Sequence, residues 1–112
     1  MPITDWSDRI IIAEMSDEPA FSDEIDALLR RLEECDVGGP DVIIDLKGVT
    51  YLNSSNLAQL LKIRKKIIMD KRRLRICSAT DGVWSVMLTT GLDSIFTFTD
   101  DVSTSLASLQ LA

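Results

Sequence analysis

The sequence contains no histidine and only two cysteines, Cys35 and Cys77. Histidine is the commonest general base near neutral pH and the commonest zinc ligand, so its absence argues against catalytic triads and zinc sites. The cysteines lack metal-ligand spacing, and we expect both to be buried free thiols rather than parts of a disulfide framework. The composition therefore argues against triad catalysis and a zinc site, and we expect no catalytic residue, cofactor or metal ligand in this chain.

Long apolar runs are also lacking, and we expect no N-terminal leader. No run approaches the roughly 20 apolar residues that span a bilayer, and residues 1–8 show no basic stretch followed by an apolar one. With two thiols expected to stay reduced, this predicts a cytoplasmic location and no membrane insertion. The length of 112 residues fits one domain over residues 1–112, and the net charge of −6 argues against direct nucleic-acid binding by the domain as a whole.

Apolar residues make up 46% of the chain, which is too many for a disordered segment, and they alternate between strand-like and helix-like patterns. We expect Leu61, Ile68 and Leu88 to belong to the buried stripes of their helices. The predicted strands are 9–15, 42–46, 74–79 and 95–98, and the predicted helices are 23–34, 54–69, 81–90 and a last one after residue 100. This order implies an α/β fold with a mixed, largely parallel sheet of four or five strands and about four helices.

Helix ends are marked by capping residues. Ser22, then Thr80 or Asp81, and finally Asp100 or Asp101 are the expected N-caps. The residues Gly38, Gly39 and Pro40 are expected to stop the first helix, and Gly91 the third. The acidic pairs Asp17-Glu18 and Asp100-Asp101 otherwise resemble solvated surface.

The junction between the second predicted strand and the second predicted helix carries four polar residues in a row, Asn53, Ser54, Ser55 and Asn56. Such residues cap helix N-termini, and capping alone is their commonest explanation. A serine at this position is also well placed to carry a phosphate, because free backbone N–H groups and the helix dipole favour negative charge there. The junction therefore indicates a phosphorylation-gated binding module rather than an enzyme.

Two separated segments, DLKGVTYLNSSNLAQLL (45–61) and TTGLDSIFTFTDDVSTSLASL (89–109), match one family pattern. They resemble the signature and the C-terminal motif of the STAS domain, the fold of bacterial anti-sigma factor antagonists. The matching residues are Asp45, Leu46, Val49, Tyr51, Leu52, Ser54, Ser55 and Leu57 in the first segment and Thr90, Gly91, Leu92, Asp93, Phe96 and Ala107 in the second.

The resemblance implies a regulatory mechanism. In these antagonists the first serine of the pair, which corresponds to Ser54, is phosphorylated by a partner serine kinase that is also the anti-sigma factor. The unphosphorylated form binds that partner and frees the sigma factor, whereas the phosphorylated form cannot bind. ATP would then be bound by the partner, and weak self-association is compatible with this role. The expected partner surface comprises Asn53, Ser54, Ser55 and Asn56, with Gly82, Val83 and Trp84 flanking it.

Two residues depart from the family pattern. Asn53 stands in place of the family's aspartate, and Asn56 in place of its glycine. Asn53 keeps the capping role without the charge, and we expect Asn56 to place a side chain where a partner approaches. STAS domains that lack the full motif also serve as scaffolding subunits, including small subunits of lipid-transport ATPases. A constitutive adaptor of a membrane transporter or another signalling complex is therefore the alternative function.

Positive charge is concentrated in one interval. Eight of the twelve basic residues lie between Lys62 and Arg75, against the single acid Asp70. We expect a solvated helix face with some electrostatic steering, while anionic lipid or nucleic acid is a third alternative that predicts salt-sensitive binding. The basic residues are Lys62, Arg64, Lys65, Lys66, Lys71, Arg72, Arg73 and Arg75.

Overall fold

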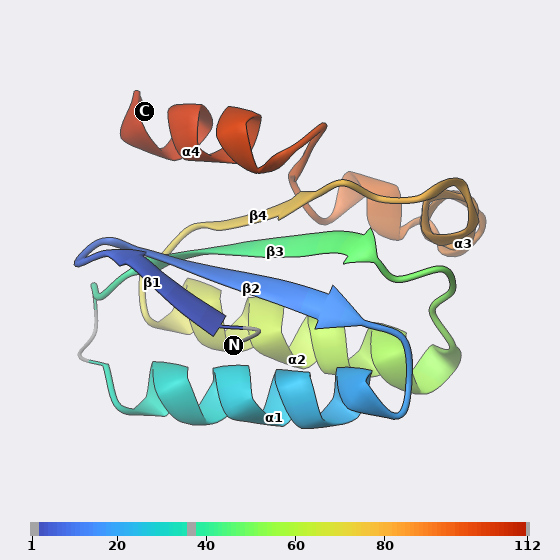
Figure 1. Ribbon diagram of the computed structural model, residues 1–112, viewed down its shortest axis with the longest axis horizontal. Coiled ribbons are helices and arrows are strands. Elements are labelled where there is room, and N and C mark those ends of the chain that lie inside the picture. The colour runs from blue at the N-terminus through green and yellow to red at the C-terminus, as the bar shows by residue number, and fades with distance from the viewer. Residues whose placement is uncertain (1–2, 36–37, 112) are drawn as a thin grey trace.

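Five strands form one mixed sheet whose spatial order follows the chain, β1-β2-β3-β4-β5 (Figure 1). The computed structural model describes residues 3–35 and 38–111. The first strand pairs antiparallel with the second, and the remaining pairs are parallel. The strands are β1 (Ile3–Ser7), β2 (Ile10–Ser16), β3 (Asp41–Gly48), β4 (Leu74–Cys77) and β5 (Phe98–Thr99).

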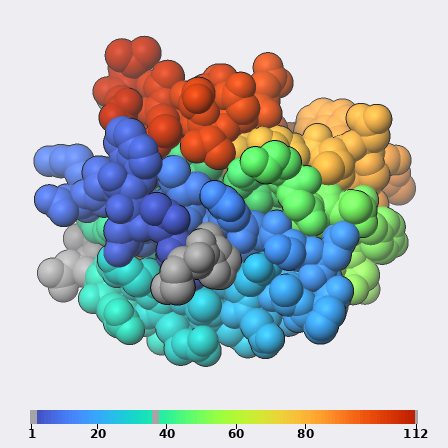
Figure 2. All heavy atoms as spheres, viewed as in Figure 1, coloured from blue at the N-terminus to red at the C-terminus, as the bar shows by residue number. Residues whose placement is uncertain are grey.

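Helices cover both faces of this sheet. One face carries α1 (Ala20–Glu33) and α2 (Ser54–Met69), and the other carries α4 (Val102–Gln110). Figure 2 shows α4 as a separate layer above the sheet. Next to the carboxyl ends of the parallel strands lie α3 (Asp81–Thr90) and the short 3₁₀ helix η1 (Leu92–Ser94). The structure thus confirms the predicted α/β fold with a largely parallel sheet and four α-helices.

The core consists of two apolar layers, one on each side of the sheet. Successive strand residues point to opposite faces, so Ile44 packs with the α1 and α2 side while Ile43 packs with Leu109 of α4. Both isoleucines are fully buried. This two-sided burial explains why β3 appears in the sequence as one continuous apolar run.

Several element ends differ from the sequence-based expectation. The strand β1 was missed, because four of its five residues are exposed and no alternating apolar pattern marks it. The final strand is confined to Phe98–Thr99, and α1 ends at Glu33, several residues before Gly38. Ile95 and Phe96, expected in that strand, lie before it in a turn that follows η1, where Ile95 N–H donates to the Leu92 carbonyl.

The prediction that Ser22 is the N-cap of α1 is wrong, because the helix begins at Ala20. Its N-cap residue is Pro19, which makes no side-chain capping hydrogen bond. Ser22 lies within the helix and donates from its N–H and its hydroxyl to the Glu18 carboxylate, at 2.8 and 2.7 Å. Three of the other predicted caps are confirmed. Thr80 caps α3, Asp101 caps α4, and Gly91 ends α3 in the left-handed region at φ 76°.

Four side chains expected in the core are not buried. Leu61, Ile68 and Leu88 are 38%, 51% and 52% exposed, because the apolar stripes of α2 and α3 are wider than the surface that the core covers. Cys35 is half-buried, and its thiol accepts a hydrogen bond from Arg31 and donates one to the Arg31 carbonyl. Cys77 is buried as expected, and burial raises the pKa of its thiol.

Candidate functional site

Ser54 lies at the edge of the sheet where the parallel strands end. It is the first residue of α2, it is exposed, and Asn53 precedes it as the N-cap. Because β2, β3 and β4 are parallel, the loops that leave them meet at this same edge, with α3 beside them (Figure 1). The site is therefore built from three segments that lie far apart in the sequence.

A reciprocal capping box fixes the start of α2. The Asn53 side chain accepts from Asn56 N–H at 2.8 Å, and the Asn56 side-chain oxygen accepts from Asn53 N–H at 3.1 Å. The N–H groups of Ser54 and Ser55 have no acceptor among the described residues. Two donors at the positive end of the helix thus remain available next to the Ser54 hydroxyl.

Asn56 is only 2% exposed, which overturns the expectation that its side chain protrudes toward a partner. Its amide nitrogen donates to Gln59 at 3.2 Å and to Glu18 at 3.4 Å. Gln59 in turn donates to the Ser22 hydroxyl at 3.0 Å. The side chain that replaces the family's glycine therefore points inward and links α2 to α1.

The acidic pair Asp17-Glu18 is structural rather than merely solvated. Asp17 accepts hydrogen bonds from the N–H and hydroxyl of Thr50, at 2.9 and 2.8 Å, and these bonds lower its pKa. Hydrogen bonds from Ser22 likewise lower the pKa of Glu18. Asp101 also has a structural role, because it caps α4, whereas Asp100 is exposed. These roles of Asp17 and Glu18 were not predicted from the sequence, although their position directly after a strand parallel to β3 was a usable signal.

The start of α3 packs closely against the same loop. A Cβ atom on Gly82 would lie 2.4 Å from the carbonyl oxygen of Thr50, so only glycine permits this approach. The Thr80 hydroxyl donates to the Val49 carbonyl at 2.8 Å. Val83 is fully buried and anchors the helix in the core. Gly82 and Val83 thus hold the start of α3 against the loop that precedes Ser54.

A shallow groove of about 320 Å³ lies beside Ser54, between α2 and α3. Tyr51, 62% exposed, forms part of its wall. Its composition, aliphatic and aromatic carbon beside hydroxyl groups, suits an apolar side chain of another protein. We call it the serine groove; it is lined by Tyr51, Leu52, Ser54, Leu57, Ser85, Val86, Thr89 and Thr90.

Trp84 lies on a different side of α3. Its ring packs edge-on against Phe98, with ring centroids 5.1 Å apart, and it lines a separate hollow of about 220 Å³ with Ala79 and Thr99. The serine groove does not include it. The structure therefore brings Asn53, Ser54, Ser55 and Asn56 together at one helix start, while Trp84, 38% exposed, faces the β5 side.

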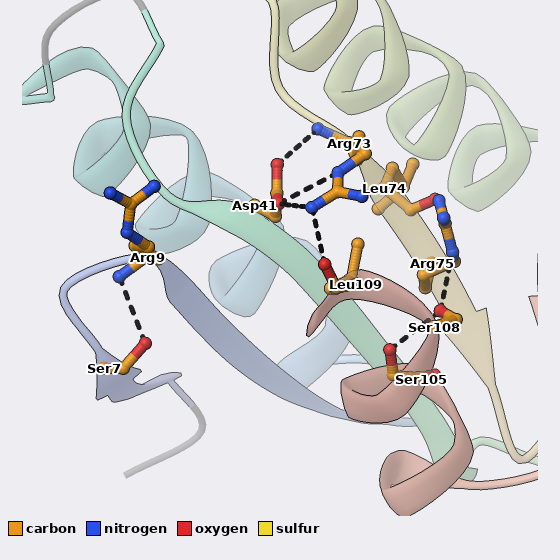
Figure 3. A network of polar contacts seen from close by, with 9 residues as sticks. All are labelled: Ser7, Arg9, Asp41, Arg73, Leu74, Arg75, Ser105, Ser108 and Leu109. Carbon is orange, nitrogen blue, oxygen red and sulfur yellow. Dashed lines mark hydrogen bonds and ion pairs between the residues drawn. The ribbon is translucent and has the colours of Figure 1, made fainter. Parts of the chain in front are cut away.

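At the opposite edge of the sheet lies a hollow of about 850 Å³, lined by Arg9, Lys71 and the Asp41–Arg73 pair among others. Arg73 bonds to both oxygens of Asp41 and donates to the Leu109 carbonyl at 2.7 Å (Figure 3). These contacts fasten the C-terminal part of α4 to β3. The hollow is remote from Ser54.

Asp45, which lies within β3, is buried, and its carboxylate accepts from the Lys47 N–H at 2.9 Å. Within residues 3–35 and 38–111, no group of three or more acidic or cysteine side chains is arranged to hold a metal ion. No helix in the described part of the chain has the length and apolarity to cross a membrane.

Comparisons with known proteins agree with this geometry. Residues 7–105 match the family model of the STAS domain. Among solved structures, an anti-sigma-factor antagonist (STAS) domain protein from Planctomyces limnophilus is similar, with a TM-score of 0.78 and 18% identity over 90% of this chain and 91% of that one.

Two further structures share the fold. A putative anti-sigma factor antagonist from Thermotoga maritima has a TM-score of 0.77 and 18% identity over 97% of this chain and 93% of its own. A serine-to-glutamate variant of RsbS from Moorella thermoacetica has a TM-score of 0.76 and 16% identity over 98% and 96%. With the family model covering most of the sequence, the chain belongs to the STAS domain family.

Proposed function

We propose that this chain is an anti-sigma factor antagonist-like switch that binds a serine kinase of anti-sigma type and is released when Ser54 is phosphorylated. The observation that carries the proposal is the position of Ser54, exposed at the first residue of α2 and at the mouth of the serine groove. Membership of the STAS family supports the same role.

A phosphate on Ser54 would be compatible with the fold. It adds about −1.5 to −2 charge, and negative charge at a helix N-terminus is stabilising. The free N–H groups of Ser54 and Ser55 are donors for phosphate oxygens. The Asn53–Asn56 capping box does not use the serine hydroxyls, so it can persist after modification.

The same phosphate would disfavour binding. It would place a strongly hydrated dianion beside a groove whose apolar walls suit a partner side chain, and burying that charge without a counter-ion costs several kcal/mol or more. Modification would therefore abolish the close contact while leaving the domain folded.

The loop keeps its shape without the family's aspartate and glycine. Asn53 supplies the cap, and Asn56 is buried in contact with Glu18. Asn56 therefore lies outside the surface that a kinase would approach, and Asn53 is exposed beside Ser54 as an uncharged cap. The two departures are therefore compatible with phosphorylation. The kinase would supply ATP, and the complex would form in the cytoplasm.

The test uses three variants of the tagged chain, purified from its native cell. Wild type and Ser54→Ala should recover a serine kinase in stoichiometric amount, whereas Ser54→Glu should recover at least about tenfold less, because its charge resembles the phosphate. Ser55→Glu is the matched control for charge at the same helix start and should lose less. Equal recovery by wild type and Ser54→Glu would refute the switch.

The free energy of unfolding of each variant must be measured in parallel. Ser54→Glu should leave the free energy of unfolding unchanged or raise it by about 0.3–1 kcal/mol through the helix dipole. A constitutive adaptor predicts a different partner, with no kinase activity and no modified form of Ser54.

A further inference from the structure

Charge is divided sharply along this chain. Residues 1–45 contain thirteen acidic and three basic residues, whereas residues 46–80 contain nine basic residues and only one acid, Asp70. The second interval runs from the end of β3 through α2 and β4 to the start of α3. One region of an acidic protein is therefore strongly basic.

Internal ion pairs neutralise only part of this region. Asp70 pairs with Lys66 at 3.0 Å and with Arg72 at 3.4 Å. Arg73 pairs with Asp41 at 2.9 Å. These three cations hold the fold together, and they contribute little to a free positive surface.

Arg64 and Arg75 make no ion pair within residues 3–35 and 38–111. Arg75 donates only to neutral acceptors, the Ser108 hydroxyl at 3.0 Å and the Leu74 carbonyl at 3.2 Å (Figure 3). Arg64 is half-buried. Their charges are therefore available to a partner.

Both arginines line one hollow of about 200 Å³ between the second half of α2, the start of β4 and the turn after η1. No acidic residue lines it, while Ile68 and Ile95 contribute apolar walls and are 51% and 41% exposed. We call it the arginine hollow. It combines positive charge with exposed aliphatic carbon in a concave site.

The arginine hollow and the serine groove lie along one side of α2. Ser54, Leu57, Leu61, Arg64 and Ile68 follow at intervals of three or four residues, which places them in one row on the helix. Leu57 lines the serine groove, and Arg64 and Ile68 line the arginine hollow. With 1.5 Å per residue, the row is about 21 Å long.

We propose that the arginine hollow binds an acidic segment of a partner protein, with carboxylates on Arg64 and Arg75 and an adjacent apolar side chain against Ile68 and Ile95. Charge complementarity and the geometry of guanidinium–carboxylate pairing identify the carboxylate, and the exposed isoleucines identify its apolar neighbour. The assignment of this segment to the protein that docks at Ser54 rests on the proposed function.

The geometry favours a protein segment over a membrane or a nucleic acid. The free lysines that a flat lipid surface would contact, Lys62 and Lys65, lie on the exposed side of α2 and do not line the hollow. Trp84, an exposed ring on which a base could stack, lines a different hollow. A small concave site with apolar walls instead suits individual side chains.

The test is a chemical-shift titration of the ¹⁵N-labelled chain with a short synthetic peptide of glutamate and leucine residues. Shift changes should concentrate at Arg64, Ile68, Arg75 and Ile95. The same peptide with glutamine in place of glutamate should not bind. Arg64→Gln/Arg75→Gln should weaken binding at least about tenfold, and Arg64→Gln alone should weaken it measurably without disturbing the Arg75–Ser108 contact.

The matched control is Lys62→Gln/Lys65→Gln, which removes two charges from the same helix outside the hollow and should change affinity less than about twofold. Equal loss in both double variants, shifts spread over all lysines, or no saturable binding would overturn the proposal. Phosphatidylglycerol vesicles provide a second comparison. If wild type and the arginine double variant bound these vesicles equally well, and both bound the peptide only weakly, the proposal would also be overturned.

The readout does not require phosphorylation. A chain that binds the peptide but is never modified at Ser54 would refute the switch and leave the arginine hollow in place. A chain that is phosphorylated at Ser54 but does not bind the peptide would refute the arginine hollow as a binding site and leave the switch in place.

Discussion

Asp17 holds Thr50 through two hydrogen bonds, one from the backbone N–H at 2.9 Å and one from the hydroxyl at 2.8 Å. The contact joins the loop after β2 to the loop that leads into Ser54. The loop that precedes Ser54 is therefore shaped by a residue that lies far outside the serine motif.

Asp17→Ala should loosen this loop. We expect faster amide hydrogen exchange at Thr50 and Tyr51, because the N–H of Thr50 loses its acceptor. Asp100→Ala removes an exposed carboxylate from a different loop and should leave exchange at both residues unchanged. Unaltered exchange in Asp17→Ala would show that the carboxylate does not position the loop.

The stability of the domain should decrease on acidification. Hydrogen bonds from Thr50 lower the pKa of Asp17, those from Ser22 lower the pKa of Glu18, and those from Thr104 lower the pKa of Asp101. A folded-state pKa below the unfolded value gives stability that is fully present above the unfolded pKa and is lost as pH falls through the folded pKa.

Since unfolded carboxyl groups titrate near about pH 4, the free energy of unfolding should fall progressively below that pH. Denaturant titrations at a series of pH values measure it. The triple variant Asp17→Asn/Glu18→Gln/Asp101→Asn should show a shallower pH dependence, and an identical slope would contradict the role of these three groups.

Asn56→Ala should destabilise the domain by about 1–2 kcal/mol, because it removes half of the capping box and the hydrogen bonds that this buried side chain makes to Glu18 and Gln59. Asn56→Gly, which restores the family's residue type, should cost about 1 kcal/mol more through helix propensity. Urea denaturation measures both. A neutral or stabilising Asn56→Gly would show that the buried contacts of Asn56 contribute nothing.

Gly82→Ala should destabilise by about 1–3 kcal/mol, because its Cβ would overlap the Thr50 carbonyl oxygen at 2.4 Å and force the start of α3 away from the loop. Ser85→Ala, at an exposed position on the same helix, should stay within about 0.5 kcal/mol of wild type. Thermal unfolding of the two variants provides the comparison. Equal midpoints would mean that the loop moves aside at no cost.

The regular elements were predictable where side-chain periodicity is strong. β2, β3 and α2 follow from continuous β-branched runs and a helical apolar pattern, and the caps at Thr80, Asp101 and Gly91 follow from local chemistry. β1 was not predictable, because it is an exposed edge strand held by backbone pairing with β2. Its side chains therefore carry no burial pattern.

The position of Ser54 was predictable because a helix start is a local property. The inward orientation of Asn56 was not, since it depends on Glu18 and Gln59, which only the folded chain brings within hydrogen-bonding distance. The same applies to Trp84, whose place against Phe98 depends on how α3 packs beside β5. Contacts between distant segments thus account for most of what the sequence left open.

The measurement that tests the central claim most directly is intact-mass and peptide mass spectrometry of the chain isolated from its native cell, with and without phosphatase. The switch predicts a phosphatase-sensitive gain of one phosphate that maps to Ser54. An unmodified mass under all growth and stress conditions, or a phosphate that maps elsewhere, would contradict it.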